Sequence, residues 1–513
     1  MKYRWLTWGD LNGFLGLMVD NITNLVFLTA ILTGVFHFPK EFIFTRMIPG
    51  TALGVLVGDL LYTWMAFRLA KKTGNPQVTA MPLGLDTPST LGIAFAVLGP
   101  TYLASNDPYL TWYVGMATLF FIGLLKILIT PFADWIREKV PQAGLLGSLA
   151  GIGLCLLAFM PLLEVFQLPL VGIVALGVLL YGLVARLRLP RGIPAVLTAV
   201  VLGTVLYYFL GSRGLLGSDF AVAAYQPALA FPLPTLAWLK GLGPALKYLP
   251  IAIPFGILTV VGGINVTESA RAAGDAYKTG SVILVEAFSS LIAALCGGVA
   301  QTTPYIGHPA YKEMGARAGY TLITALFIGL GGILGYLSAI ITWIPQAALA
   351  PIFVFIGLEI VAQAYKVCPS RHYPAVAFAI LPIMAEFFRI KWVSILSDLN
   401  IDPLQMSPGM YRQFLTVNAL GHGFILTGML WGAFLALMID RKLLASAGFL
   451  LITAFFTLFG VIHSAKLSGD IYLPWQAGSA IPYHYAAGYL LLALLLVLGF
   501  GFKAPAKSPI MEE

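Results

Sequence analysis

The chain has 513 residues, of which 59% are hydrophobic and only 10% are Asp, Glu, Lys or Arg. Soluble domains carry about a quarter charged residues, so this composition excludes a soluble globular protein. A net charge of +8 would suggest nucleic acid in a soluble protein. In a membrane protein it is explained by basic loops on one side of the bilayer, so we expect no nucleic-acid partner.

Apolar runs of about 20 residues, the length that crosses the hydrocarbon core of a bilayer, recur along the whole chain. In order, they predict membrane helices at 11–36, 48–70, 111–132, 143–163, 169–187, 193–212, 246–273, 281–299, 317–341, 346–366, 373–389, 412–439, 443–465 and 482–502. Two further segments, 80–99 and 300–316, are broken by Pro and Gly and bring the total to sixteen. The predicted fold class is therefore an all-α polytopic membrane protein.

The basic loops test this count. With the N-terminus inside, nearly all short basic clusters fall on the cytoplasmic side, namely 68–72, 137–139, 185–191, 270–278, 312–317, 365–372, 440–442 and 502–507. This pattern is typical of a correct topology. It predicts an inner-membrane protein with both termini in the cytoplasm. We expect the stretch 390–411 to be an irregular, amphipathic segment on the outer face.

Two pairs of local matches indicate an internal repeat of seven plus seven segments. Asn21-Ile22-Thr23-Asn24 in the first segment resembles Asn265-Val266-Thr267-Glu268 in the eighth, and MPLGLDTPST (81–90) resembles TTPYIGHPAY (302–311). In the second pair, an extended stretch with Pro leads through Gly to a polar residue and another Pro. Short matches also arise by chance, but two in the right order favour a repeat of seven plus seven segments followed by two extra C-terminal helices.

The second pair predicts two half-helices preceded by short extended strands. Pro is well suited to the first turn of a helix, and a polar residue before it can cap the turn, so we expect half-helices to begin at Thr87-Pro88 and His308-Pro309. Irregular backbone within a membrane is tolerated only where it is buried in protein or lines a cavity. Two such breaks in corresponding halves indicate the binding site of a transporter, with the helix N-termini facing the ligand.

Ionisable residues inside the membrane are costly and are therefore functional candidates. Glu268 lies beside Asn265 and can bind ligand N–H groups or exchange a proton, although pairing with Arg271 is the structural alternative. His308 can contact a ligand or titrate, or can simply cap its half-helix. These two residues are the predicted proton-coupling groups.

The remaining candidates for substrate binding surround the two breaks: Asp86, Thr87, Tyr305 and Asn24. Asp86 has a helix cap as its alternative role, and Tyr305 can stack on a ligand. We expect Asp59 and Glu286 to have a structural role as paired residues. We expect Lys126 to make an interhelical contact or to snorkel toward the membrane surface. No metal-ligand spacing, ATP-binding motif or hydrolase motif stands in a suitable context, so we expect no metal, no cofactor and no enzymatic activity.

The sequence resembles the xanthine/uracil permease family, the nucleobase–ascorbate transporters. The resemblance is carried by TTPYIGHPAYKEMGARAGYT (302–321), with Arg317 at the place of the family's terminal Arg, and by NVTESARAAGD (265–275), with Glu268 at its substrate-binding glutamate. Three features depart from the family pattern. His308 stands for its second glutamate, Asp20-Asn21 and Asn24 replace its Gln-His, and two helices are added at the C-terminus.

The resemblance implies an inverted-repeat fold with a core domain at 1–134 and 246–341, and a gate domain at 142–212 and 343–439. Helices at 443–502 are additional. It also implies proton-coupled uptake of a nucleobase such as xanthine or uracil, by elevator-type alternating access in a homodimer. The alternative is an inorganic-anion transporter of the related sulfate-permease architecture, and a channel is a weaker one. Against an anion stands Glu268, because an anion site gains nothing from a second negative charge.

Overall fold

The computed structural model describes residues 3–132, 140–187, 189–190, 195–217, 220, 229–305, 307–399, 401–467 and 469–499. The predicted cytoplasmic clusters at 137–139 and 502–507, and parts of 185–191, lie outside these residues. In the described part, eight helices are long and apolar enough to cross a membrane, or ten if each of two bent pairs counts as one span. Three shorter apolar helices accompany them.

Helices dominate the first half of the chain. The α-helices are α1 (Trp8–Gly34), α2 (Lys40–Phe42), α3 (Ile48–Thr73), α4 (Thr87–Ile93), α5 (Gly99–Ser105), α6 (Pro108–Ile129), α8 (Gln142–Gly151), α9 (Met160–Gln167), α10 (Pro169–Leu179) and α11 (Ala195–Ser212). Turns of π-helix, at Ile43–Met47, Ala94–Leu98, Ile152–Phe159 and Leu180–Val184, join or extend several of them. The one described strand of this half, β1 (Leu83–Leu85), directly precedes α4.

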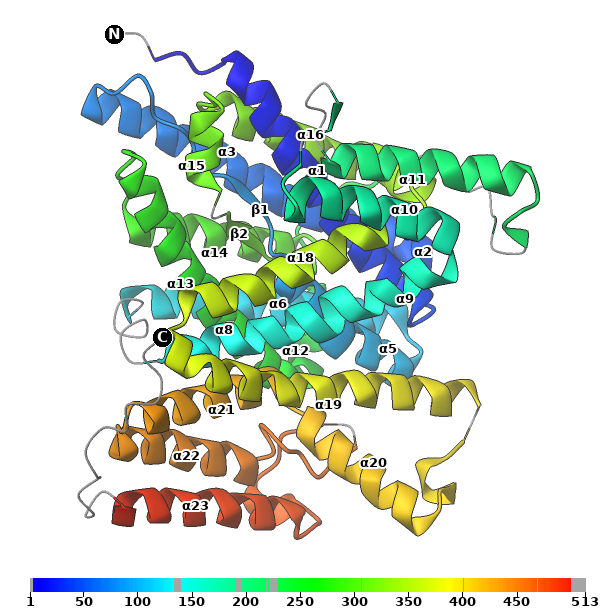
Figure 1. Cartoon of the computed structure of the whole chain (residues 1–513), viewed down its shortest axis with the longest axis vertical. Helices are drawn as coiled ribbons and strands as arrows, with labels where there is room; N and C mark the ends of the chain where they lie inside the picture. Colours follow the sequence, from blue (N-terminus) through cyan, green and yellow to red (C-terminus); the bar gives the residue numbers. More distant parts are fainter. Residues whose placement is uncertain are drawn as a thin grey trace. The chain divides into compact units, whose positions relative to one another are not determined.

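The second half has a similar make-up. Its α-helices are α12 (Leu242–Ala245), α13 (Leu249–Ala272), α14 (Thr279–Leu295), α15 (His308–Glu313), α16 (Gly319–Leu334), α17 (Tyr336–Trp343), α18 (Gln346–Val367), α19 (Tyr373–Asp398), α20 (Pro408–Gly421), α21 (Phe424–Ile439), α22 (Leu443–Leu458) and α23 (Ile481–Gly499). Strand β2 (Thr302–Pro304) precedes α15 and pairs with β1 (Figure 1). Each predicted segment thus overlaps a helix or a strand–helix pair.

The structure departs from the predicted segments in three places. The helices expected at 317–341 and 412–439 are each bent, by 88° between α16 and α17 and by 73° between α20 and α21. Gly335 and Gly423 sit at these bends with φ of 79° and 68°, a backbone conformation that suits glycine. The stretch 390–411, expected to be irregular, is helical as far as Asp398, since nothing in Ile390–Asp398 breaks the helix.

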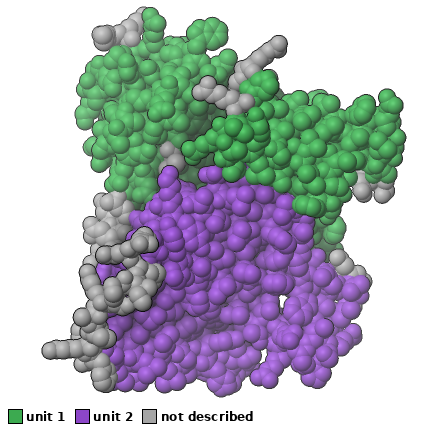
Figure 2. All heavy atoms as spheres, viewed as in Figure 1, with its two compact units in different colours: residues 1–136, 164–248, 255–352 green, residues 137–163, 249–254, 353–513 purple. Residues whose placement is uncertain are grey.

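Two compact units make up the chain (Figure 2), with unit 1 formed by 1–136, 164–248 and 255–352, and unit 2 by 137–163, 249–254 and 353–513. The segments predicted for the gate fall in both units, and the division into core and gate stays a prediction. In unit 1, β1 and β2 lie among α1, α3 and α14 (Figure 1). Helix α6 packs on α14, and α16 packs on α3.

Unit 2 is a helical stack in which α8 packs against α19 and α21, and α22 lies between α21 and α23 (Figure 1). The extra C-terminal helices are joined to α21 by polar contacts as well as apolar ones. The indole of Trp431 in α21 donates to the Tyr489 hydroxyl of α23 at 2.9 Å, and the Ser446 hydroxyl of α22 donates to Phe434 O of α21 at 2.7 Å. Helices α22 and α23 are therefore an integral part of unit 2.

Candidate functional site

The candidate site is built around the two short strands, which pair side by side. We call the region around β1 and β2 the strand crossing, or simply the crossing. β1 and β2 are antiparallel, with Leu83 opposite Pro304 and Leu85 opposite Thr302. All residues of both strands are buried. Strands of three residues satisfy few backbone groups by themselves, so the remaining buried N–H and C=O groups need other partners. The sequence predicted both strands and their position before the half-helices, and the structure confirms this.

Side chains supply those partners at Leu85. Its N–H donates to Asn21 Oδ1 at 3.1 Å, and its carbonyl accepts from Asn24 Nδ2 at 3.3 Å and from the Tyr305 hydroxyl at 3.0 Å. Asn21 and Asn24 lie one turn apart on α1, which is why both reach the same residue. Asn24 Oδ1 is buried and has no hydrogen-bond partner among the residues that the structure describes. An unpaired acceptor is therefore present beside the strand crossing.

Asp86 caps the half-helix that follows β1. Its Oδ2 accepts from Ser89 N at 3.0 Å and from Gln301 Nε2 at 3.1 Å. The cap is thus Asp86 and not Thr87, which is the first helical residue, and Pro88 follows without an N–H. We expected the start of this half-helix to offer its N–H groups to a ligand. This is corrected in part, because the cap and the proline already account for two of the first three donor positions.

His308 has a different place from the predicted one. Gly307 is the cap of α15, and His308 is its first helical residue. The buried His308 Nε2 donates to Thr79 O at 3.2 Å and lies 3.3 Å from Asp275 Oδ2. Lys312, one turn further along α15, reaches the other oxygen of Asp275 at 2.7 Å. The prediction that His308 caps its half-helix is therefore wrong: the ring ties α15 to the connection between α13 and α14.

The two predicted site residues of α13 are accessible. Asn265 and Glu268 both have exposed side chains, whereas Asn24 is 1% exposed. Of the predicted residues, hydrogen bonds to Leu85 and Gln301 bring Asn24, Tyr305 and Asp86 together at the strand crossing, with Thr87 adjacent in the chain. The roles proposed for Glu268 and His308 in proton coupling stay predictions.

Gln301 is a site residue that the sequence analysis missed. It is fully buried, and within the described part of the chain its Oε1 has no hydrogen-bond partner. In the observed register, Asp86 follows Leu85 and Gln301 precedes Thr302, so an antiparallel pairing places the two residues opposite each other. Asp86 N donates to Gln301 O at 2.9 Å, which extends the ladder by one bond. If the two predicted strands had also been aligned in this register, Gln301 would have been predicted to lie opposite Asp86.

A buried ion pair supports the crossing from α6 and α14. Lys126 Nζ lies 2.5 Å from Glu286 Oε1, and both side chains are 0% exposed. The same ammonium donates to Thr302 O in β2 at 3.3 Å. The expected interhelical contact of Lys126 is thereby confirmed, and its partner is Glu286. Since this cation is already paired, the carboxylates Asp20 and Asp86 near β1 make the crossing rich in acceptors and negative charge.

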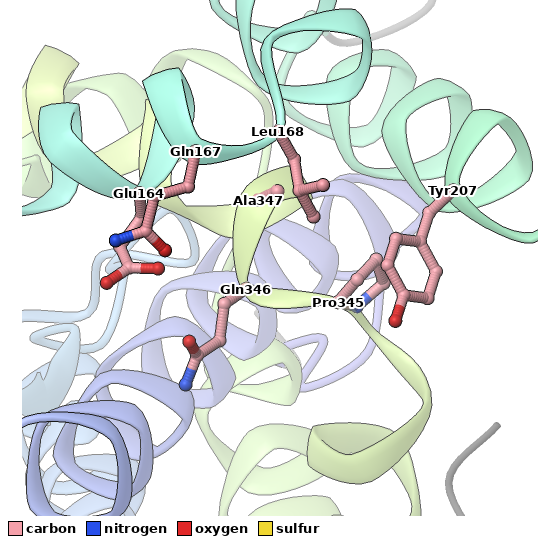
Figure 3. A pocket seen from close by; sticks show the side chains of 7 residues that line it. All are labelled: Glu164, Gln167, Leu168, Tyr207, Pro345, Gln346 and Ala347. Carbon is pink, nitrogen blue, oxygen red and sulfur yellow. The ribbon is translucent and has the colours of Figure 1, made fainter. Parts of the chain in front are cut away.

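A cavity of about 520 Å³ lies elsewhere in unit 1 (Figure 3). It is lined by residues at the end of α9, in α11 and at the start of α18, namely Glu164, Gln167, Leu168, Tyr207, Pro345, Gln346 and Ala347. Figure 3 shows the polar side chains of Glu164 and Gln167 on one side and the ring of Tyr207 on the other. None of the residues predicted for the site lines this cavity.

Sequence comparison and structural comparison give different results. No protein-family model matches the chain, and no curated protein matches it. Among solved structures, the transmembrane domain of BicA, a bicarbonate transporter of a cyanobacterium, matches with a TM-score of 0.51 at 16% identity, over 77% of this chain and 98% of that one. SLC26A9 matches with a TM-score of 0.50 at 12% identity, over 85% of this chain and 65% of that one.

At these identities the likeness establishes the fold. The chain is an all-α polytopic membrane protein with the inverted-repeat architecture of those transmembrane domains. Its paired strands before half-helices and its two extra C-terminal helices fit the fold class predicted from sequence. The narrower resemblance to xanthine/uracil permeases stays a prediction.

Proposed function

We propose that this protein is a secondary active transporter whose substrate binds at the crossing of β1 and β2. The observation that carries the proposal is a pair of short strands, within otherwise helical apolar segments, whose surrounding side chains include the unpaired acceptors Asn24 Oδ1 and Gln301 Oε1. Non-helical backbone in a membrane is found where it is buried in protein or lines a cavity, and broken segments in corresponding repeat halves mark transporter sites. The fold shared with the BicA domain supports the same class.

The first candidate substrate is a small inorganic anion such as bicarbonate or sulfate. Its support is the shared fold, since the matching domain belongs to a bicarbonate transporter. The local charges set a condition on this reading. Lys126 is paired with Glu286, while Asp86 and Asp20 leave the crossing negative. An anion there needs a compensating positive charge. We therefore propose that the anion moves together with a proton.

The second candidate is a nucleobase, which the sequence resemblance implies. It is favoured by the unpaired acceptors beside the strands, because the ring N–H groups of uracil or xanthine would satisfy Asn24 Oδ1 and Gln301 Oε1 directly. A neutral base also avoids the repulsion that an anion meets. In this reading, Glu268 stays the proposed second contact to ligand N–H groups.

Exchange of labelled solute across the membrane of proteoliposomes that contain the purified protein decides between these candidates. We expect counterflow with either bicarbonate and sulfate or uracil and xanthine, and competition only within the matching group. Gln301→Ala should weaken exchange, because it removes the Asp86 contact and the free acceptor. Gly243→Ala is the matched control, since nothing lies within 4 Å of the added methyl. Absence of exchange with all four solutes would contradict the proposal.

Glu268→Gln tests the residue taken from the resemblance. If Glu268 binds substrate or couples protons, exchange or its pH dependence should change, whereas unaltered uptake at every pH would show that it has neither role. A homodimer and elevator-type movement are further parts of the proposal. The mass of the purified protein in detergent, with the detergent contribution subtracted, tests the first.

A further inference from the structure

Asp59 is a buried carboxyl group that neither candidate mechanism uses. It lies near the middle of α3 and is 0% exposed. Neither of its oxygens has a hydrogen-bond partner, and no ion pair joins it to any residue in the described ranges. An isolated charge is costly at such depth, so unpaired intramembrane carboxyl groups are functional candidates.

Several titratable groups and one backbone N–H interact electrostatically with Asp59 or with its neighbour Tyr62. They are Tyr62 on the same helix, the backbone N–H of Leu83 in β1, Tyr311 in α15 and Tyr320 in α16, with Glu286 of α14 beyond Tyr62. The Leu83 N–H does not meet hydrogen-bond geometry with the carboxyl group. The one further acid of this set, Glu286, is paired with Lys126, and no ion pair joins that ammonium group to Asp59 among the described residues.

The neighbouring hydroxyl groups are committed elsewhere. The Tyr62 hydroxyl donates to Val282 O at 3.0 Å, and the Tyr320 hydroxyl donates to Ala80 O at 2.7 Å. A metal ion at Asp59 would need several ligands, and the described residues hold no cluster of three or more His, Cys, Asp or Glu side chains here. A proton needs no further ligand and removes the charge. The geometry therefore favours a neutral carboxyl group over a bound metal ion.

Asp59 is also coupled by packing to the proposed binding site. A methyl group on its neighbour Gly58 would lie 2.6 Å from a Leu83 methyl carbon, so α3 touches β1 closely. Leu83 stands two residues before Leu85, which Asn21, Asn24 and Tyr305 hold. An ionised Asp59 attracts the Leu83 N–H, and a neutral one attracts it less. The charge of Asp59 thus acts on the strand that forms the site.

We propose that Asp59 carries the coupling proton of this transporter. This inference rests on the proposed function, whose coupling step it specifies. On release, the O–H bond of the carboxyl group breaks, the proton passes to a water molecule, and the electron pair stays on the carboxylate. Uptake of a proton from water on the other side reverses the step.

Infrared spectroscopy of the purified full-length protein tests the protonation directly and needs no substrate. We expect the C=O stretch of a protonated carboxyl group in the wild type at neutral pH, and its loss in Asp59→Asn. Asp107→Asn is the control, because Asp107 is an exposed helix cap. Identical spectra for the wild type and Asp59→Asn would overturn the inference. If Asp59→Asn does not fold, Asp59→Glu should shift the band instead, and an unshifted band would be equally decisive against it.

Transport assays with bicarbonate, sulfate and uracil as probes test the coupling. With a pH gradient of about one unit, one-proton symport sustains roughly a tenfold accumulation of substrate. Asp59→Asn should lose this accumulation and keep exchange of labelled for unlabelled substrate. Retained accumulation would refute the role of Asp59. Absence of exchange in the wild type would instead reject the proposed function, while the infrared result still decides whether Asp59 holds a proton.

Discussion

Glu286 and Asp59 lie on α14 and α3, which the predicted seven-plus-seven repeat makes counterparts, yet their surroundings differ. Glu286 lies on α14, which packs on β2, and Asp59 lies on α3, which packs on β1. Glu286 has Lys126 at 2.5 Å, whereas none of the described residues is a cationic partner of Asp59. The repeat thus reproduces the scaffold and leaves one half without a compensating charge. An inverted repeat can place two acids on similar helices, and only the acid without a cationic partner is then suited to bind and release a proton.

Removing the cation of the paired half should have the largest effect. Lys126→Met leaves Glu286 buried without a counter-ion and removes the bond to Thr302 O. Breaking a buried pair in this way costs about 3–5 kcal/mol. We expect a large fall in the midpoint of thermal unfolding, followed by fluorescence of the protein in detergent.

The double variant Lys126→Met with Glu286→Leu is the control for that prediction. Replacing a whole buried ion pair by apolar side chains is often close to neutral, so most of the lost stability should return. A double variant as unstable as Lys126→Met alone would show that packing around Lys126, and not its charge, supports the crossing. The comparison between the halves would then lose its electrostatic basis.

Asp275→Asn tests a second buried cluster outside the crossing, with a smaller expected effect. Burial raises the pKa of Asp275, but hydrogen bonds from His308, Lys312 and Thr79 N outweigh it and hold the pKa below its ordinary value. The charged form therefore stabilises the fold above the unfolded pKa of about 3.9, and this contribution is lost as the pH falls through the folded pKa. We expect a loss of roughly 2–3 kcal/mol at neutral pH, since hydrogen bonds to charged groups are strong.

The pH dependence separates this role from simple packing. The difference in thermal midpoint between wild type and Asp275→Asn should shrink as the pH falls below about 4, because the wild-type carboxylate is then protonated as well. A difference that stays constant down to the acid limit of the folded protein would mean that the charge of Asp275 contributes nothing. It would also weaken the structural role assigned to His308.

The two strands differ in one further respect, which Gly84→Ala tests. An added methyl group at Gly84 would collide with the Tyr305 ring and hydroxyl, whereas the opposite residue of β2 is Thr303. Displacing the ring breaks its bond to Leu85 O, and overpacking of this kind costs typically about 1–3 kcal/mol. Both thermal stability and substrate exchange should fall. Stability and exchange equal to those of Gly243→Ala would show that the Tyr305 contact is dispensable.

Local patterns in the sequence predicted the frame of the site but not its pairings. Pro88 and Pro309 each follow a polar residue after an extended stretch, and this spacing located both half-helices. The partner of His308 could not be found in this way, because Asp275 lies in a different connection and reaches it only through folding. Likewise, the sequence shows Asp59 and Glu286 as similar acids on similar helices, and only packing reveals that Lys126 serves one of them.

Asp59→Asn should have the smallest effect on stability, and for that reason it is the sharpest test of the comparison. If Asp59 is already neutral, replacing its carboxyl group by the carboxamide of Asn removes no charge and no hydrogen bond. The thermal midpoint at neutral pH should then stay within the change typical of a mild substitution, under about 1 kcal/mol. Glu286→Gln, an equally small change in shape, should cost several times more, because it strands Lys126 without its counter-ion. Equal losses in the two variants would mean that both carboxyl groups carry the same charge state, and the asymmetry from which proton coupling was inferred would disappear.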